Sequence, residues 1–313
     1  MAAAVLWFWP SDRYLFLPHP ARDVDSLVRV PGESTEPEEN GIYMVDILVR
    51  RASLLERILP DIREGSTLVP PEAVNPTGVS DTQRRRESLH QMSRSQEVAV
   101  AVALRELGHE VDATPAGAEV TAVFADAPAQ GKLEAGDVVV AAQGRRVRTP
   151  GDLRAIMAQH PPGQPVAWRV RRSGGTREVR LETEAAPEEP DRAVVGVLVA
   201  QAADIDLPVA VRIDAGDIGG PSAGLAFALD VVDELGDDID GDRRIAVTGE
   251  LELDGDILAV GGIKQKTIGA RLGEADIFLV PDDNAAEARR YADGLAVIPV
   301  STFEEALSAL ARG

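Results

Sequence analysis

A serine and two lysines in the last third of the chain have the residue types that acyl-transfer chemistry requires. Ser222 lies in the sequence Gly-Pro-Ser-Ala-Gly, directly before an apolar stretch that is typical of a buried helix. A serine hydroxyl is a weak nucleophile unless a neighbouring base removes its proton. The unpaired N–H groups at a helix start could hold the oxyanion that forms when the hydroxyl attacks a carbonyl. The same pattern also occurs in ordinary glycine-rich turns and in loops that bind anions.

The candidate bases are Lys264 and Lys266, in the sequence Gly-Gly-Ile-Lys-Gln-Lys. A lysine acts as a base near neutral pH only when burial lowers its pKa from about 10.4. The surrounding sequence is apolar enough for such burial. Residues two apart on a helix point about 200° away from each other, so only one lysine can face Ser222. The pattern alone does not select between them, and an exposed surface position is the alternative for either.

Composition narrows the class of protein. The chain has 313 residues, a hydrophobic fraction of 44% and a formal net charge of −20. This length allows two or three domains, each with its own core. The acidic balance argues against nucleic acid as a partner, because binding it needs a basic face. There is no cysteine, and the four histidines show no metal-ligand spacing with acidic residues, so we expect neither a thiol nucleophile nor a metal.

An apolar run at the N-terminus, Ala2–Trp9, ends at Pro10. A membrane-spanning helix needs about 20 residues. The run also lacks the basic start and small-residue cleavage site of a signal peptide. The sequence as it stands therefore predicts no membrane span. The run is equally compatible with the end of an anchor that begins before the assigned Met1, which would attach the protein to a membrane.

The segment before residue 110 contains elements that need partners elsewhere. Ile42–Arg50 is rich in β-formers and predicts one strand, whereas the three prolines of Thr67–Pro76 predict irregular structure. Asp81–Leu107 predicts a long helix, capped at Ser80 or Asp81 and ended by Gly108. The second half of this helix is apolar nearly all round and must be buried.

Residues 113–184 contain the string Leu-Glu-Ala-Gly-Asp-Val from Leu133, followed by Gly144, with a strand before it and a helix and hairpin after it. This pattern resembles that of a PDZ domain. PDZ domains bind chain ends by adding a strand at a sheet edge. The resemblance implies a groove between the strand Glu119–Phe124 and the helix Asp152–Met157, with a capture loop at Pro115–Ala118. The implied peptide-binding residues are Ala118, Glu119, Val120, Thr121, Leu153, Ile156 and Met157.

Two motifs in order, GPSAGL and VTGELELDGDILAVGGIKQK, resemble the proteolytic domain of the Lon family from about Val209 to Val300. The resemblance implies that Ser222 and Lys266 are catalytic and that Thr248 orients the lysine. The supporting turn residues are Gly220, Pro221, Ala223 and Gly224. With the PDZ segment upstream, the whole resembles bacterial PDZ-containing Lon-like proteases. No Gly-x4-Gly-Lys-Ser/Thr loop is present to hold phosphates, so we expect neither an ATPase module nor a cofactor in these residues.

The expected fold is α/β (α+β), a Lon-type protease domain with an inserted, mainly β PDZ domain. The segment from Val194 to Ser222 is short and supplies few strands to support the serine turn. We therefore expect the elements before the PDZ domain to complete the catalytic domain. The expected divisions are an N-terminal segment 1–40, a first catalytic part 41–110, the PDZ domain 113–184 and the proteolytic domain 193–313.

The expected function is a serine endopeptidase that acts on polypeptide, with the PDZ domain presenting or gating the substrate. The family resemblance implies a homo-oligomeric ring and a membrane-associated, outward-facing location. The alternative is an inactive Lon-like and PDZ scaffold that binds chain ends. A weaker alternative is phosphate binding by the turn Gly219–Gly224, which the net acidity disfavours.

Overall fold

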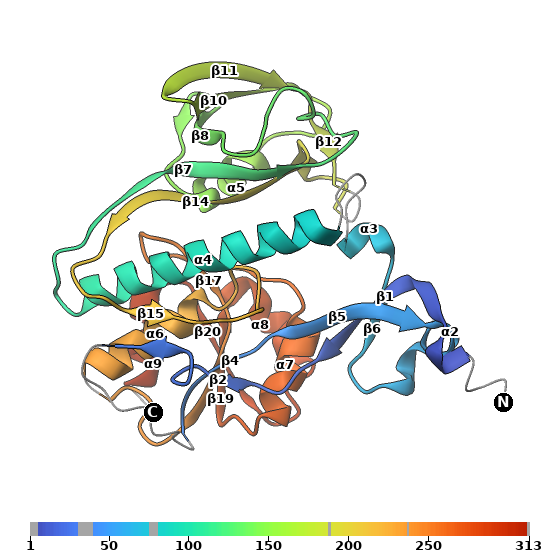
Figure 1. Cartoon of the computed structure of the whole chain (residues 1–313), viewed down its shortest axis with the longest axis vertical. Coiled ribbons are helices and arrows are strands. Elements are labelled where there is room, and N and C mark those ends of the chain that lie inside the picture. Colours follow the sequence, from blue (N-terminus) through green and yellow to red (C-terminus); the bar gives the residue numbers. More distant parts are fainter. Residues whose placement is uncertain (1–5, 31–39, 75–80, 187–188, 237, 312–313) are drawn as a thin grey trace.

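The computed structural model describes residues 6–30, 40–74, 81–186, 189–236 and 238–311. Figure 1 shows three regions: a β-rich domain at the top, an α/β domain below the long helix α4, and a small β lobe near the N-terminus. The fold is thus the expected mixed α/β class with a mainly β domain. The candidate helix cap at Ser80 and the start of the apolar run at Ala2 lie outside the described residues.

A five-stranded sheet organises the α/β domain, in the order β2-β4-β16-β19-β20. Four of its strands are parallel, and β2 runs antiparallel at the edge. The strands are β2 (Arg22–Asp23), β4 (Gly41–Met44), β16 (Arg244–Val247), β19 (Ile277–Pro281) and β20 (Ala296–Val300). Their apolar runs suit a parallel sheet that is covered on both faces. β4 precedes the β-rich domain in the chain, yet Ile42 pairs directly with Ile245.

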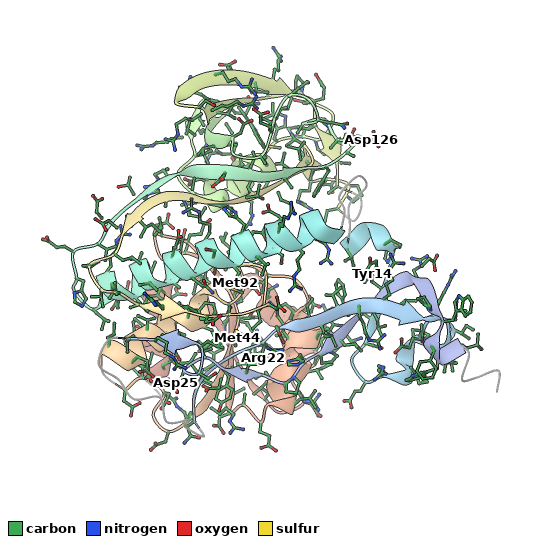
Figure 2. The ribbon with its side chains drawn as sticks, viewed as in Figure 1. Tyr14, Arg22, Asp25, Met44, Met92 and Asp126 are labelled. Atoms are coloured by element: carbon green, nitrogen blue, oxygen red, sulfur yellow. The ribbon has the colours of Figure 1, made fainter. Side chains whose placement is uncertain are left out.

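Helices cover both faces of this sheet. One face packs against α4 (Asp81–Glu106), α6 (Gly224–Leu235) and α9 (Phe303–Leu310), and the other packs against α7 (Ile263–Leu272) and α8 (Asp282–Arg289). The alternation of the strand places Ile245 and Val247 in the first core and Ala246 in the second. Met92 of α4 and Met44 of β4 lie in the same core (Figure 2). The apolar half of α4 is therefore buried, as its sequence predicts.

Two sequence predictions in the N-terminal part were wrong. The stretch Ile42–Arg50 is not one strand, because the chain leaves the central sheet after β4 and enters a second sheet as β5 (Ile47–Ser53). There β5 lies beside β1 (Pro10–Pro18), which also pairs with β6 (Thr67–Val69). The supposedly irregular stretch Thr67–Pro76 thus contains β6 and the short helix α3 (Pro71–Val74). A proline is tolerated there because it occupies the first helical position, where no N–H bond is needed.

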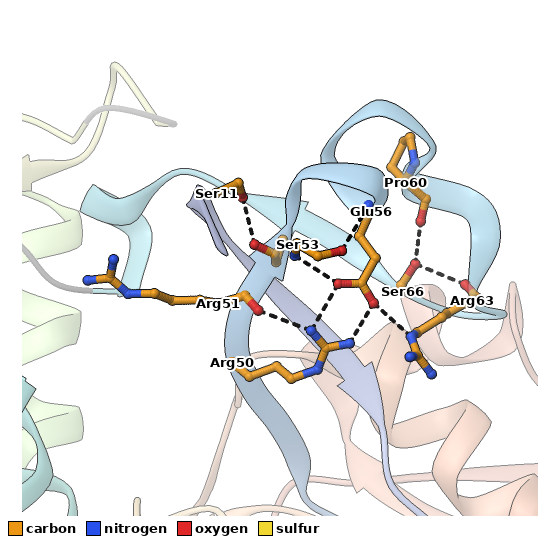
Figure 3. Close-up of polar contacts among 9 residues, drawn as sticks. Ser11, Arg50, Arg51, Ser53, Glu56, Pro60, Arg63 and Ser66 are labelled. Carbon is orange, nitrogen blue, oxygen red and sulfur yellow. Dashed lines mark hydrogen bonds and ion pairs between the residues drawn. The ribbon is translucent and has the colours of Figure 1, made fainter. Parts of the chain in front are cut away.

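Ion pairs support this small N-terminal lobe, whose apolar core is limited to a few side chains (Figure 3). Helix α2 (Leu54–Ile58) begins with a capping box between Ser53 and Glu56. Glu56 is only 2% exposed and accepts hydrogen bonds from Arg50 at 2.6 and 2.9 Å and from Arg63 at 2.8 Å. The Arg50 guanidinium, together with the Ser53 N–H and Arg63, holds the pKa of Glu56 well below its usual range. Glu56 is therefore a buried charge that is fully paired.

The β-rich domain has a separate core around Trp168 and Val120. Its main sheet has the order β11-β10-β8-β7-β14, with β9 (Arg145–Arg146) beside β8. The other elements are β7 (Asp112–Val123), β8 (Val138–Ala142), α5 (Pro150–Ala158), β10 (Val166–Arg172), β11 (Gly175–Leu181) and β14 (Val197–Asp206). The predicted hairpin turn is present, with positive φ at Ser173 and Gly174. Strand β14 then leads the chain back to the α/β domain.

Three short strand pairs, an isolated bridge and a turn complete the described fold. Short antiparallel pairs join β12 (Glu184–Ala185) to β13 (Ala193–Val194), β15 (Arg212–Ile213) to β3 (Val28–Arg29), and β17 (Glu250–Leu251) to β18 (Ile257–Leu258). A single bridge connects Asp256 to Thr302. A 3-10 turn, η1 (Pro60–Ile62), follows α2. The pair β15–β3 matters below because it brings the segment before Ser222 against the N-terminal segment.

Candidate active site

Ser222 lies in a turn that is fixed to the end of β16. Its carbonyl oxygen accepts hydrogen bonds from the N–H of Gly249 at 2.9 Å and from the Thr248 hydroxyl at 3.2 Å. The N–H of Leu225 in turn donates to the carbonyl of Gly249 at 3.2 Å. Helix α6 begins at Gly224, two residues later than the sequence suggested. Among the described residues, the N–H groups of Ser222 and Ala223 have no hydrogen-bond partner.

The glycines of this turn are required by helix α4. A Cβ on Gly224 would lie 2.7 Å from the Ser95 hydroxyl, and one on Gly219 would collide with Ser88. Gly220, which has a φ of 90°, donates its N–H to the Ser88 carbonyl at 2.8 Å. The Ser95 hydroxyl also donates to the carbonyl of Pro221 at 3.0 Å. Gly219 and Gly224 are therefore needed for the close approach of α4 to this turn.

Lys266 occupies the second turn of α7 and is 3% exposed. Its Nζ donates to Thr248 Oγ1 at 3.0 Å. Burial lowers the pKa of Lys266 from 10.5 to about 7, against the opposing attraction of Asp46. Lys264 points elsewhere, because its Nζ donates to the Ser66 carbonyl at 3.0 Å. The two lysines therefore diverge as the helical spacing predicts, and the one that shares surroundings with Ser222 is Lys266.

A chain of donors connects the lysine to the serine backbone. Lys266 Nζ donates to Thr248 Oγ1, and Thr248 Oγ1 donates to the carbonyl of Ser222. Thr248 is fully buried, so its hydroxyl has little freedom to seek other partners. Within the described residues, no hydrogen bond joins Lys266 Nζ directly to Ser222 Oγ. Ser222 and Lys266 both line one open cleft of about 1430 Å³.

Asp46 is a residue of this cleft that the sequence reasoning missed. It lies where the chain passes from β4 to β5, and it lines the cleft together with Lys266. Its carboxylate pairs with Arg22 at 3.5 Å and with the His19 imidazole at 3.1 Å. Its charge acts to raise the pKa of Lys266. The available signal was an acidic residue in the middle of an otherwise apolar β-rich run, which marks a break in that run.

The predicted groove residues of the β-rich domain do not form an open edge. Strand β7 pairs with β14 along its length and with β8 at Ala118 and Glu119, so both of its edges are occupied there. The predicted capture loop Pro115–Ala118 lies inside β7. Val120 of β7 lies in the interior of the domain, together with Leu153, Ile156 and Met157 of α5, and Thr121 is partly buried. The two end strands of this sheet are β14, which lies beside β7, and β11.

A second buried titratable group lies where the two domains meet. Glu252 is 2% exposed and accepts a hydrogen bond from the N–H of Gly151, near the start of α5, at 2.9 Å. Burial raises the pKa of Glu252 from 4.5 to about 7, although bonds from Thr149 and Gly151 oppose this. Gly151 is needed at this contact, because a Cβ there would lie 2.6 Å from Glu252 Oε2. Beside it, Arg154 pairs with Glu250 at 3.3 Å.

The described residues offer neither a metal site nor a membrane span. No group of three His, Asp or Glu side chains in the described ranges could hold a metal ion. No helix in the same part of the chain is long and apolar enough to cross a membrane. At the end of the apolar N-terminal run, Phe8 and Trp9 are exposed.

Two ranges of the chain match known protein families. Residues 197–312 match the Lon protease (S16) C-terminal proteolytic domain, which is a class of serine peptidase. Residues 102–183 match the PDZ domain. Two parts of the chain are thus similar to a Lon-type proteolytic domain and to a PDZ domain.

Curated relatives agree with this assignment. The Lon protease of Azospirillum brasilense is 34% identical over 164 residues, which cover 50% of this chain and 20% of that protein. The Lon protease of Azorhizobium caulinodans is 38% identical and covers 33% and 12%. Lon protease 2 of Bacillus subtilis is 33% identical and covers 33% and 18%. The matched part of the chain therefore spans a fifth or less of the length of each of these relatives.

Two solved structures each match about a quarter of this chain. The PDZ domain of the SdrC-like protein from Listeria monocytogenes is 18% identical and covers 26% of this chain and 86% of that chain, with a TM-score of 0.25. GtR34C from Geobacillus thermodenitrificans is 28% identical and covers 26% and 94%, with a TM-score of 0.24.

Proposed function

We propose that the chain is a serine endopeptidase in which Ser222 is the nucleophile and Lys266 is the general base. The observation that carries the proposal is the buried lysine. Lys266 lines the same cleft as Ser222 and hydrogen-bonds to Thr248, and its pKa is lowered to about 7. An amine with this pKa is partly neutral at physiological pH and can accept a proton, which an ordinary surface lysine cannot do.

In the proposed first step, neutral Lys266 takes the hydroxyl proton of Ser222 while Ser222 Oγ attacks the carbonyl carbon of the scissile peptide bond. The N–H groups of Ser222 and Ala223, which lack partners among the described residues, hold the oxyanion. The C–N bond then breaks, and Lys266 returns its proton to the leaving amine. Water attacks the acyl-enzyme in the second half of the reaction, again with Lys266 as base. Thr248 keeps Nζ oriented throughout as a positioning residue.

The proposed catalytic domain is discontinuous. Its parts would be the elements before the PDZ domain, chiefly β4 and α4, and the segment from about residue 193 onward. Support comes from the pairing of β4 with β16 and from the core that α4 shares with α6. The hydrogen bonds of Ser88 and Ser95 on α4 to the turn that contains Ser222 also support this division. A fragment that lacks α4 should therefore not hold Ser222 in place.

We further propose that the PDZ domain presents polypeptide to the cleft and that copies of the chain assemble as a ring. Because β7 is occupied on both sides, the edge offered for strand addition is that of β14. Leu198 near the start of β14 is an exposed large apolar residue. The 313 residues contain no phosphate-binding loop, so peptide cleavage is proposed to proceed without ATP hydrolysis by these residues.

The test is cleavage of casein and of short peptides by the wild-type chain, Ser222→Ala and Lys266→Ala. We expect each substitution to lower kcat/KM by about 10³-fold or more, because the nucleophile and its base act as a unit. Labelling of Ser222 by a serine-directed phosphonate in the wild type, but not in Lys266→Ala, would support the same pair. Equal cleavage by all three proteins would refute the proposal, and absence of both cleavage and labelling would favour the inactive scaffold.

A further inference from the structure

The cleft that contains Ser222 and Lys266 differs in charge from the rest of the molecule. The whole chain has 32 basic and 52 acidic side chains. The cleft, in contrast, is lined by more arginines than acids. The arginines are Arg22, Arg29, Arg84, Arg85 and Arg212, and the acids are Asp46, Asp214, Asp217 and Glu250. An excess of one sign inside a cleft attracts ligands of the opposite sign more strongly than the net charge suggests.

Most of the acids in the cleft are already engaged. Asp46 pairs with Arg22, which Figure 2 labels, and Asp217 pairs with Arg85. Glu250 pairs with an arginine of the PDZ domain. Asp214 accepts a hydrogen bond from the N–H of Gly216 at 3.0 Å. Within the described residues, no ion pair is therefore formed by Arg29, Arg84 and Arg212, which we call the arginine cluster.

Two members of the arginine cluster lie directly opposite each other. In the antiparallel pair β15–β3, Arg212 is the cross-strand partner of Arg29. Side chains at directly opposed positions lie on the same face of the strands, and like charges there are destabilising. The pair would be relieved by an anion that interacts with both guanidinium groups. This feature is independent of the composition of the cleft.

The third member supplies a donor that also lacks a partner. Arg84 Nε on α4 is shielded from solvent and has no hydrogen-bond partner in the described part of the chain. A shielded guanidinium N–H without an acceptor is costly and is satisfied when a carboxylate enters. Arginine suits this role because its planar group can bind a carboxylate with two parallel hydrogen bonds. The segment after Arg212, Ile213–Ser222, lines the same cleft and leads to the serine.

We propose that the arginine cluster binds an acidic side chain of the polypeptide substrate, so that the cleft selects substrates with a Glu or Asp near the scissile bond. This rests on the proposed peptidase function and names its substrate class. A carboxylate on a bound polypeptide is favoured over a free anion because the cluster shares its cleft with Ser222 and Lys266. Free phosphate is the competing occupant.

The experiment uses peptides that contain a single Glu, or a single Gln, at successive positions on either side of a cleaved bond. We expect the wild type to cleave the best Glu peptide with a kcat/KM about 10- to 100-fold above its Gln counterpart, as for one charge-assisted hydrogen-bonded pair. In the double variant Arg29→Gln/Arg212→Gln this ratio should fall towards one. The matched control is Arg86→Gln. Arg86 is an exposed arginine of α4 that does not line the cleft, so this variant should keep the wild-type ratio.

A binding measurement separates this inference from the proposed catalysis. Fluorescently labelled Glu and Gln peptides are titrated against Ser222→Ala, with and without the two arginine substitutions. We expect tighter binding of the Glu peptide by a similar factor, removed by the substitutions, even if the wild type cleaves neither peptide. Equal Kd values for the two peptides would overturn the proposal. So would inorganic phosphate binding that depends on the arginine cluster without any difference between the peptides.

The effect of these substitutions on folding is checked with the same variants. Because Arg29 and Arg212 repel each other, their replacement should leave the thermal midpoint unchanged or slightly raised. If the double variant is nevertheless unstable, Arg84→Gln alone provides the second test. It should reduce the Glu-to-Gln ratio, and an unchanged ratio would count against the proposal.

Discussion

Lys266 and Glu252 are two buried ionisable groups whose pKa values are shifted by the same physical cause but whose surroundings differ. Burial lowers the pKa of Lys266 from 10.5 to about 7 and raises that of Glu252 from 4.5 to about 7. In both cases the interior disfavours the charged form. Lys266, however, lines an open cleft, whereas Glu252 is enclosed between β17 and the start of α5. A shifted pKa therefore marks burial, and the cleft beside it marks a candidate for chemistry.

The two groups affect stability over different pH ranges. The folded pKa of Lys266 is below its unfolded value, so the unfolded chain binds more protons between about pH 7 and 10.5, and stability rises with pH there. The folded pKa of Glu252 is above its unfolded value, so stability falls as pH rises from 4.5 to about 7. The two unfavourable contributions overlap most strongly near neutral pH.

The largest expected effect that separates the two groups is that of Lys266→Met. We expect kcat/KM to fall by about 10³-fold or more. The free energy of unfolding at pH 7 should rise by about 1–3 kcal/mol, because a buried amine that is partly charged is replaced by an apolar side chain. Peptide cleavage and urea unfolding measure the two quantities. Lys264→Met, two residues away and bonded to Ser66, is the matched control and should retain activity. Loss of activity with a loss of stability would indicate a purely structural lysine.

An intermediate effect is expected in the pH dependence of cleavage. Between pH 5 and 7, kcat/KM should rise about tenfold per unit as Lys266 loses its proton, and it should level off above about pH 7. Because Glu252 titrates in the same range, the profile is also measured for Glu252→Gln. An unchanged midpoint in that variant assigns the profile to Lys266. A midpoint that moves with Glu252→Gln would contradict the comparison.

The smallest expected effect concerns the domain contact. Glu252→Gln keeps an acceptor for the Gly151 N–H but cannot ionise, so the free energy of unfolding at pH 8 should rise by about 1–3 kcal/mol. The gain should vanish near pH 4, where Glu252 is protonated in both states. Urea unfolding at the two pH values checks this. A gain of equal size at both would show that desolvation of a charge is not the cause.

A steric variant probes the same contact without changing charge. Gly151→Ala places a methyl group 2.6 Å from Glu252 Oε2 and should loosen α5, seen as faster amide exchange there. Gly175→Ala in the same domain is the matched control, because its nearest neighbour would be 3.7 Å away.

Local signals predicted individual elements well. Thr302 accepts a hydrogen bond from the N–H of Glu305 and caps α9, as its position suggests. At α8 the aspartate that precedes the apolar residues, Asp282, is already the first helical residue, and the N-cap is Pro281. The hairpin through Asp254 and Gly255 is present between β17 and β18. Such features depend on neighbouring residues and are therefore visible in the sequence.

Features that depend on residues distant in the chain were harder to predict from the sequence. The stretch Ile42–Arg50 is divided because its first part pairs with β16 in the central sheet and its last part pairs with β1 in the N-terminal sheet. The β-propensity of the stretch does not indicate that two different sheets are involved. The approach of Ser222, Thr248 and Lys266 was anticipated by motif resemblance, but Asp46 was not, because its partner Arg22 lies in β2 and its partner His19 lies just before β2, more than 20 residues earlier in the chain. Glu252 was missed for a similar reason, since the PDZ domain that buries it is remote in the chain.

The pairing of β4 with β16 has a consequence for how the molecule comes into being. The ribosome makes β4 and α4 first, then the PDZ domain, and only about 200 residues after β4 does the strand that must lie beside it emerge. Contacts between such distant segments form slowly, while a domain of contiguous sequence can fold as soon as it is complete. Ser222 also emerges before Lys266. An unfinished chain can therefore carry a folded β-rich domain before Ser222, Thr248 and Lys266 are brought together, so the proposed activity would be delayed until the last strands are in place.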